Sequence, residues 1–348
     1  MTGTLTLTTL VSFNGANGAG PGSLIADANG DIFGTTALGG ANEDGTVFEI
    51  PKTAGGYAST PTTLVSTLEA PERSLIADAN GDLFGTTADG GANGLGSVVE
   101  IAKTAGGYAS TPTTLVSFNG TNGEFPEGSL IVDSNGDLFG TALQGGANDG
   151  TVFEIVKSAG GYASMPTTLD SFNVADGVDP QAGLIADANG DLFGTTALGG
   201  ANGDGTAFEI AKTAGGYASM PTTLVSFNET NGGDPIASLI ADANGDLFGT
   251  TAGGGANEGG TVFEIAKTAG GYASMPTTLV SFNDANGELP EGGLIADANG
   301  DLFGTTDGGG ANGDGGVFEI AKTAGGMPAR PPRLSASTER TVRGLRAV

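Results

Sequence analysis

The sequence predicts an all-β protein, a six-bladed β-propeller of four-stranded blades, and two observations support this prediction. One phrase, Leu-Ile-Ala-Asp-Ala-Asn-Gly-Asp-Leu-Phe-Gly-Thr-Thr, recurs with small variations, and its copies begin at Leu24, Leu75, Leu130, Leu184, Leu239 and Leu294. The intervals of 51, 55, 54, 55 and 55 residues suit a propeller blade better than a solenoid coil. Glycine is 65 of 348 residues, so turns are frequent and long helices are disfavoured.

Each copy contains four strand candidates, which the first copy illustrates. Residues 24–27 precede Asn29-Gly30, the dipeptide that most strongly favours a hairpin turn, and residues 31–36 follow it. A glycine-rich loop leads to a third candidate at 46–50, and a loop containing Gly55-Gly56-Tyr57 leads to a fourth at 62–66. The first and third candidates are almost continuously apolar, as expected for sheets covered on both faces by neighbouring sheets.

The strand count predicts how the ring closes. The first three candidates occur six times, whereas the fourth follows only the first five copies. Its sixth version stands at residues 8–14, so we expect an N-terminal strand to complete the last blade and remove an open edge. The predicted propeller domain spans 4–326, with blade cores starting near residues 23, 74, 129, 183, 238 and 293. Residues 327–348 are predicted to be a disordered basic tail, and their foreign composition would also fit a frame-shifted or truncated product.

Composition excludes several kinds of site. Cys, His and Trp are absent, so disulfides, Cys/His zinc sites, cysteine nucleophiles and Ser-His-Asp triads are excluded. The net charge is −27, and residues 1–326 carry 7 basic and 38 acidic residues. Such a surface repels nucleic acid and anionic lipid. No stretch is long and apolar enough for a membrane helix, and no signal peptide is visible, so we expect either a cytoplasmic protein or a fragment. We expect a monomer without membrane insertion.

The repeats resemble a known family. Gly-Asp-Leu-Phe-Gly-Thr-Thr at 190–196, Gly-Gly-Ala-Asn-Gly-Asp-Gly-Thr at 199–206 and Leu-Val-Ser-Phe-Asn at 224–228 resemble the GloVer tandem-repeat family of bacterial proteins. The resemblance implies a repeat protein that is commonly exported and tethered by differing C-terminal anchors. It therefore implies a secreted or cell-surface location, and it implies neither an assigned activity nor catalytic residues.

Two motifs have the composition of calcium loops. The segment Asp27-Ala28-Asn29-Gly30-Asp31 has acidic oxygens at alternate positions, as the start of an EF-hand loop does, but it lacks the later ligands. A hairpin turn explains the motif more simply. The segment 199–205 is similar to the calcium-binding nonapeptide of β-rolls, but that motif requires copies every nine residues, whereas here they are about 55 apart. We expect no cofactor, with calcium as the alternative.

Acidic residues of the loops are the first candidate binding surface. In a propeller, the loops between blades and the loops between the second and third strands share one face, and loops that vary on a uniform scaffold commonly carry recognition. The candidate binding residues there are Asp44, Asp149, Asp204 and Asp314. Other acidic residues expected on the same face are Glu43, Asp176, Asp179, Asp234, Glu258 and Asp284.

The residues two positions before the start of each blade core are the second candidate surface, at the mouth of the central channel. Glu72, Glu127, Gln181 and Glu291 stand there, and Pro21 and Ile236 precede the strands of the other two copies. Three of these carboxylates converging on one axis could hold a calcium ion that polarises a carbonyl group. Solvated glutamates are the simpler interpretation.

Two functions follow from these alternatives. Near-identical blades offer the same groups six times, which suits multivalent binding of a glycan or protein surface better than catalysis by distinct groups. We therefore expect a non-enzymatic binding module without catalytic residues. The alternative is a calcium-dependent hydrolase or lyase that acts at the channel mouth through Glu72, Glu127 and Glu291.

Overall fold

The fold was examined in a computed structural model that describes residues 8–66, 71–147 and 149–322. The chain divides into two compact units, residues 1–118 with 162–165 and residues 119–161 with 166–348. The described residues form strands and turns without a helix. The predicted fold class is confirmed, since successive repeats form the antiparallel blade sheets of a six-bladed β-propeller. The predicted tail lies outside the described residues.

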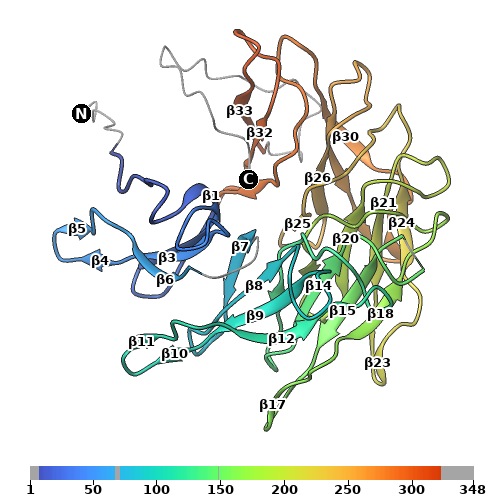
Figure 1. The fold of residues 1–348 in the computed structure, drawn as a ribbon. Coiled ribbons are helices and arrows are strands. Elements are labelled where there is room, and N and C mark those ends of the chain that lie inside the picture. Colours follow the sequence, from blue (N-terminus) through green and yellow to red (C-terminus); the bar gives the residue numbers. More distant parts are fainter. Residues whose placement is uncertain (1–7, 67–70, 148, 323–348) are drawn as a thin grey trace. The chain divides into compact units, whose positions relative to one another are not determined.

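The first unit contains the first two sheets, which Figure 1 shows in blue to cyan. The strand order of the first sheet follows the chain, and its strands are β1 (Ala19–Ala26), β2 (Ile32–Leu38), β3 (Thr46–Ile50) and β6 (Thr62–Val65). The second sheet repeats this order with β7 (Pro71–Ala77), β8 (Leu83–Thr87), β9 (Ser97–Ile101) and β12 (Thr113–Ser117).

The second unit contains the remaining four sheets, which follow one another in chain order (Figure 1). The third sheet has β13 (Ile131–Val132), β14 (Leu138–Ala142), β15 (Thr151–Ile155) and β18 (Thr167–Ser171). The fourth has β19 (Ile185–Ala186), β20 (Leu192–Thr196), β21 (Thr206–Ile210) and β24 (Thr222–Ser226). The fifth has β25 (Ile240–Ala241), β26 (Leu247–Thr251), β27 (Thr261–Ile265) and β30 (Thr277–Ser281). The sixth has three described strands, β31 (Ile295–Ala296), β32 (Leu302–Thr306) and β33 (Gly316–Ile320).

Small hairpins project from the first five sheets, where the sequence had indicated only loops. Each pairs the Lys-Thr or Lys-Ser dipeptide after the third strand with the following Gly-Tyr dipeptide. They are β4 (Lys52–Thr53) with β5 (Gly56–Tyr57), β10 (Lys103–Thr104) with β11 (Gly107–Tyr108), β16 (Lys157–Ser158) with β17 (Gly161–Tyr162), β22 (Lys212–Thr213) with β23 (Gly216–Tyr217), and β28 (Lys267–Thr268) with β29 (Gly271–Tyr272).

The N-terminal segment takes part of its predicted place. The structure assigns no strand to residues 8–14. The ring of Phe13 nevertheless packs edge-on against Phe48 of β3, with 4.9 Å between centroids. Phe172, which follows β18, packs in the same way against Phe208 of the next sheet. Residues 8–14 therefore contact the first sheet in the way that the residues after a fourth strand contact the next sheet. The pairing of residues 8–14 with the sixth sheet stays a prediction.

The second and third strands supply most of the core, whereas the sequence had indicated that the first and third strands are covered on both faces. All residues of β8, β14, β20 and β26 are buried, whereas β13, β19 and β25 are only partly so. One large cluster joins Phe193 and Val225 of the fourth sheet to Leu239 and Phe263 of the fifth. Within each unit the core therefore lies between successive sheets, and a blade needs its neighbour to bury its apolar side chains.

A glycine in the middle of the second strand makes room for this packing. Gly249 lies opposite Phe263, and a methyl group at Gly249 would stand 2.6 Å from the Phe263 ring and 2.9 Å from Leu239 Cδ2. Gly140, Gly194 and Gly304 have the same surroundings in their own sheets. The absent side chain is therefore the space into which the phenylalanine ring and the leucine of the first strand fit.

We predict that Gly249→Ala lowers the free energy of unfolding by about 1–3 kcal/mol, because the added methyl group overpacks a core of rigid rings. Gly270→Ala is the matched control, since nothing lies within 4 Å of the methyl group it would add. Urea denaturation of both variants measures the difference. Equal midpoints for the two variants would contradict the packing assigned to Gly249.

Candidate functional site

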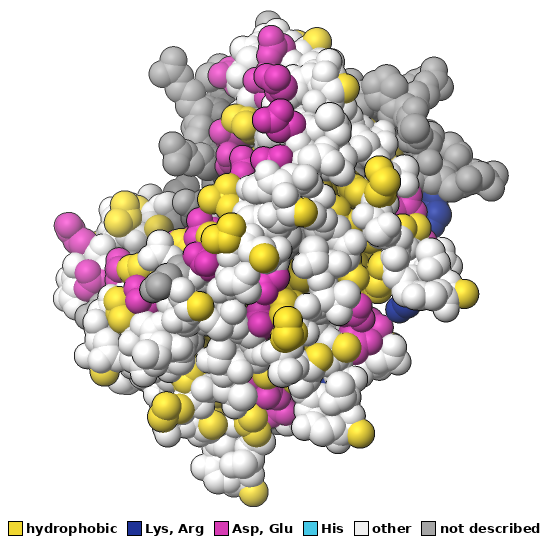
Figure 2. Space-filling view, turned by 90° about the vertical axis from the view of Figure 1, so that its right-hand side faces the viewer, with side chains coloured by type: hydrophobic (Ala, Val, Ile, Leu, Met, Phe, Trp, Pro, Cys, Tyr) yellow, Lys and Arg dark blue, Asp and Glu magenta, His cyan; other side chains and the backbone are white. Residues whose placement is uncertain are grey.

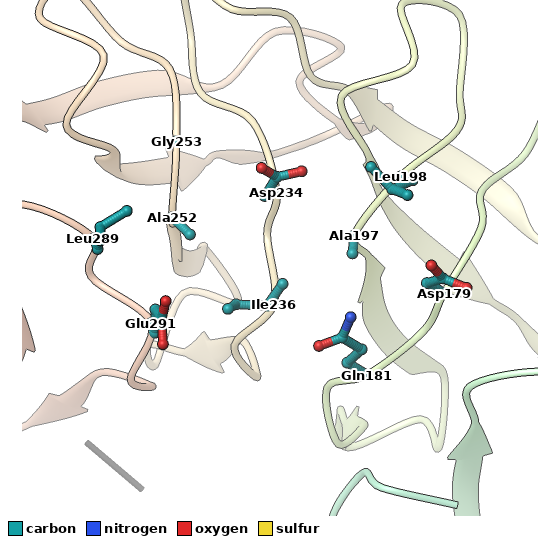
Figure 3. Close-up of a pocket in the computed structure, with 10 residues that line it drawn as sticks. All are labelled: Asp179, Gln181, Ala197, Leu198, Asp234, Ile236, Ala252, Gly253, Leu289 and Glu291. Atoms are coloured by element: carbon teal, nitrogen blue, oxygen red, sulfur yellow. The ribbon is translucent and has the colours of Figure 1, made fainter. Parts of the chain in front are cut away.

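An open pocket of about 390 Å³ in the second unit is the candidate binding site (Figure 3). Three consecutive blade connections supply its walls, each through the residues on either side of a proline. The pairs are Asp179 with Gln181, Asp234 with Ile236, and Leu289 with Glu291. Figure 3 shows the three connections side by side, with the Leu289 pair on the left and the Asp179 pair on the right. Ala197, Leu198, Ala252 and Gly253, which follow the second strands, complete the lining.

The residue before each proline has an unusual backbone conformation. The φ angles of Asp179, Asp234 and Leu289 are 58°, 55° and 54°, and Phe125 of the third repeat has 54°. This left-handed region favours glycine, and Gly20 takes it at the same place in the first repeat with φ of 65°. The turn therefore accommodates a side chain at the cost of strain, which is typical of positions where the side chain serves a purpose other than stability.

Backbone hydrogen bonds hold this residue from both sides. The Asp234 amide donates to the Asp204 carbonyl of the preceding blade at 3.2 Å, and its carbonyl accepts the Ala252 amide at 2.9 Å. Asp179 is held in the same way by Asp149 and Ala197, as is Leu289 by Gly259 and Asp307. The polypeptide backbone thus fixes where each displayed side chain begins, whatever that side chain is.

The pocket is acidic. Burial raises the pKa of Asp179, and the Asp149 carboxylate raises it further; burial and then Asp204 do the same to Asp234. Gln181 adds an amide, Glu291 a third carboxylate, and Ile236 and Leu289 add aliphatic surface, while no lysine or arginine is among the lining residues. Acidic side chains are also spread over the face shown in Figure 2, where basic ones occupy a small area. The site therefore disfavours anionic ligands.

The structure brings together only some of the residues expected from the sequence. Gln181 and Glu291 of the expected channel mouth line the pocket. Glu127 stands at the equivalent place in the third repeat, and the side chain of Glu72 lies outside the described residues. Their convergence with Glu291 stays a prediction. The loop residues Asp149 and Asp204 lie beside the pocket residues. Asp44, Asp204 and Asp314 each bridge to a glycine of their own loop, namely Gly39, Gly199 and Gly309.

Sequence reasoning gave no site role to Leu198, Ala252, Gly253 and Leu289. The signal that could have indicated the site is the proline that recurs at one place in every repeat, with different residues on both sides. These prolines are Pro21, Pro71, Pro126, Pro180, Pro235 and Pro290.

The aspartate-rich turns form hairpins, as the simpler interpretation of that motif predicted. Asp27 Oδ1 accepts the amides of Asn29 and Asp31 at 2.9 and 3.0 Å, and Asp27 Oδ2 lies 3.6 Å from Lys103 Nζ of the next blade. Burial alone would raise the pKa of Asp27, but these amides and the Lys103 charge lower it. The oxygens of the motif are therefore engaged by donors of the protein itself. Among the described residues, no cluster of three acidic side chains has the arrangement of a metal site.

Fold and site define a repeat propeller that presents variable side chains from a constant backbone, and comparison with known proteins places the chain in a family. It belongs to the Gloeobacter/Verrucomicrobia repeat family, whose model matches residues 1–167 and 148–330. This confirms the resemblance found in the repeats. No curated protein matches the chain.

Two solved structures share the fold. One is the "extracellular domain of the putative one component system BT4673" from B. thetaiotaomicron, with 12% identity and a TM-score of 0.57; the match covers 96% of this chain and 35% of that one. The chain thus spans about a third of that structure. The other is described as "a putative 6-phosphogluconolactonase" from Bacteroides uniformis, with 13% identity and a TM-score of 0.53, covering 87% of this chain and 81% of that one. In the described part of this chain, no helix has the length and apolar character of a membrane span.

We predict that Leu289→Gly leaves the free energy of unfolding unchanged or raises it, because glycine adopts the left-handed conformation without strain. Leu289→Val should lower it by about 1–3 kcal/mol, since a β-branched side chain fits that conformation least well. Urea denaturation of the two variants checks the order. A valine variant as stable as the glycine variant would contradict the strain assigned to this turn.

Proposed function

We propose that the chain is a non-enzymatic binding module, secreted or exposed at the cell surface, whose ligand docks in the pocket lined by the residues around the prolines. The observation that carries the proposal is the contrast between a constant backbone and changing side chains. The position before the proline is occupied by Gly20, Ala70, Phe125, Asp179, Asp234 and Leu289, and the position after it by Gly22, Glu72, Glu127, Gln181, Ile236 and Glu291. Variation at displayed positions is typical of recognition surfaces.

The chemistry of the lining supports a neutral or cationic partner. Carboxylates and an amide accept hydrogen bonds from hydroxyl and amino groups, and the aliphatic side chains offer surface to an apolar part of the ligand. A glycan or a protein surface with exposed basic or hydroxylated side chains supplies both. The extracellular domain among the fold relatives supports the proposed location, as does the export implied by the family resemblance.

The alternative function, a calcium-dependent hydrolase or lyase, draws on the fold shared with the structure from Bacteroides uniformis. The activity named for that structure concerns a phosphorylated compound. A pocket with three carboxylates and no basic lining residue would repel a phosphate group. The lining therefore favours the binding module over this particular activity.

We expect the purified chain to bind members of a glycan array or of an array of basic peptides, and not matched acidic peptides. The double variant Gln181→Ala with Ile236→Ala should weaken binding at least about tenfold, because it removes a polar and an apolar contact. Met220→Ala is the matched control, since that side chain is exposed and does not line the pocket.

The arrays are run with calcium and with a chelator. Binding that the pocket variant leaves intact, or no binding on either array, would contradict the proposed function. Binding or activity that disappears with the chelator would favour the calcium-dependent alternative.

A further inference from the structure

One carboxylate occupies a core position of the third sheet. Asp170 of β18 stands where the other repeats with a fourth strand have valine, namely Val65, Val116, Val225 and Val280. Those valines are 1–4% exposed, and Asp170 is 8% exposed. An ionisable group therefore occupies a position where the other repeats bury an aliphatic side chain. This substitution lowers the free energy of unfolding unless the carboxyl group stays neutral.

The surroundings of Asp170 are apolar. In the fourth sheet, Val225 belongs to a cluster with Leu239, Leu247 and Phe263 of the following sheet. The matching cluster between the third and fourth sheets contains the equivalents of these residues, Leu184, Leu192 and Phe208, together with Val152, which lies opposite Asp170 in the strand register. Between these two clusters, the described residue that changes from apolar to ionisable is the one at position 170.

The carboxyl group is only partly satisfied. It accepts a hydrogen bond from the Ser171 amide, but its Oδ2 atom is buried and has no hydrogen-bond partner among the described residues. Burial, and after it the charge of Asp176 in the connection that follows β18, raises the pKa of Asp170 from 3.8 to about 6. The apolar cluster beside Asp170 draws on β15, β20 and β21, and the charge that raises its pKa is that of Asp176.

Asp170 lies at the base of a pocket wall. Two residues after it, the Phe172 amide donates to the Gly150 carbonyl at 3.0 Å and begins the connection that carries Asp179 and Gln181. Val178 of the same connection bridges to Leu198, which also lines the pocket. Loosening β18 at Asp170 therefore loosens one attachment of residues 172–182, namely the strand end from which they begin.

We propose that Asp170 is a pH-sensitive element that keeps the pocket wall formed by residues 172–182 closed while it is protonated and lets that wall open when it ionises. The element requires no ligand, so it does not depend on the proposed function; it would make any binding at the pocket pH-dependent. Folding raises the pKa of the Asp170 carboxyl group. The protonated group therefore contributes its full share to the free energy of unfolding below the pKa of the unfolded chain, 3.8, and this share is lost as the pH rises through about 6.

Hydrogen exchange of the full chain tests the proposal without a ligand. The opening equilibrium of residues 172–182, corrected for the pH dependence of chemical exchange, should rise about tenfold between pH 5 and pH 7.5, as linkage predicts for these two pKa values. The equivalent residues 227–237, which follow Val225, provide the internal reference and should not show this rise.

Two variants complete the experiment. Asp170→Val restores the residue of the other repeats and should reduce the pH dependence of exchange in residues 172–182 to that of residues 227–237, where Asp234 matches Asp179. Val225→Asp should transfer the pH dependence to residues 227–237. Exchange of residues 172–182 that does not change with pH in the unmodified chain, or that changes equally in the Asp170→Val variant, would overturn the proposal, whether or not the pocket binds a ligand.

Discussion

Within each unit, the structure depends on the packing of a blade's apolar face against the next blade. A four-stranded sheet whose second and third strands are buried on both faces is not stable in isolation, and the clusters that bury these strands contain residues of two successive sheets. Phenylalanine pairs such as Phe227 with Phe263 lie at the centre of these contacts, with ring centroids 4.8 Å apart. The glycine of the second strand is a local adjustment to this requirement.

Polar contacts between neighbouring blades fix the orientation of the sheets, but they supply only a small part of the free energy of folding. At the hairpin end, Lys267 lies over the ring of Tyr272 and 3.5 Å from Asp187 of the preceding sheet, and the tyrosine packs on Phe193 of that sheet. Such half-exposed ion pairs contribute at most about 1 kcal/mol each. At the opposite end, buried threonines donate to carbonyls of the next blade connection, as Thr195 does to Ala237. These contacts hold the connections, and hence the pocket residues, in register with the sheets.

Much of the fold could be predicted because the same pattern of strands and turns recurs six times in the sequence. The Asn-Gly turns and the strand at 46–50 appear as expected, since turn chemistry and alternation act locally. The pocket could not be predicted in full, because it is formed by connections that are about 55 residues apart and its backbone conformation gives no hydrophobic pattern. The acidic residues drew attention to Gln181 and Glu291 but not to Leu289, and only the tertiary structure shows that Asp170 replaces a buried valine. The fourth strand expected at 8–14 depends on a distant sheet, which local pattern cannot test.

A double-mutant cycle across one blade junction tests the central claim most directly. Phe227→Leu and Phe263→Leu are combined and compared with the pair Phe172→Leu and Phe263→Leu, whose rings belong to different junctions. If successive sheets depend on each other, the first pair should show a coupling free energy of about 0.5–1.5 kcal/mol in urea denaturation, and the second should be additive within about 0.5 kcal/mol. Additivity of the first pair would contradict the account.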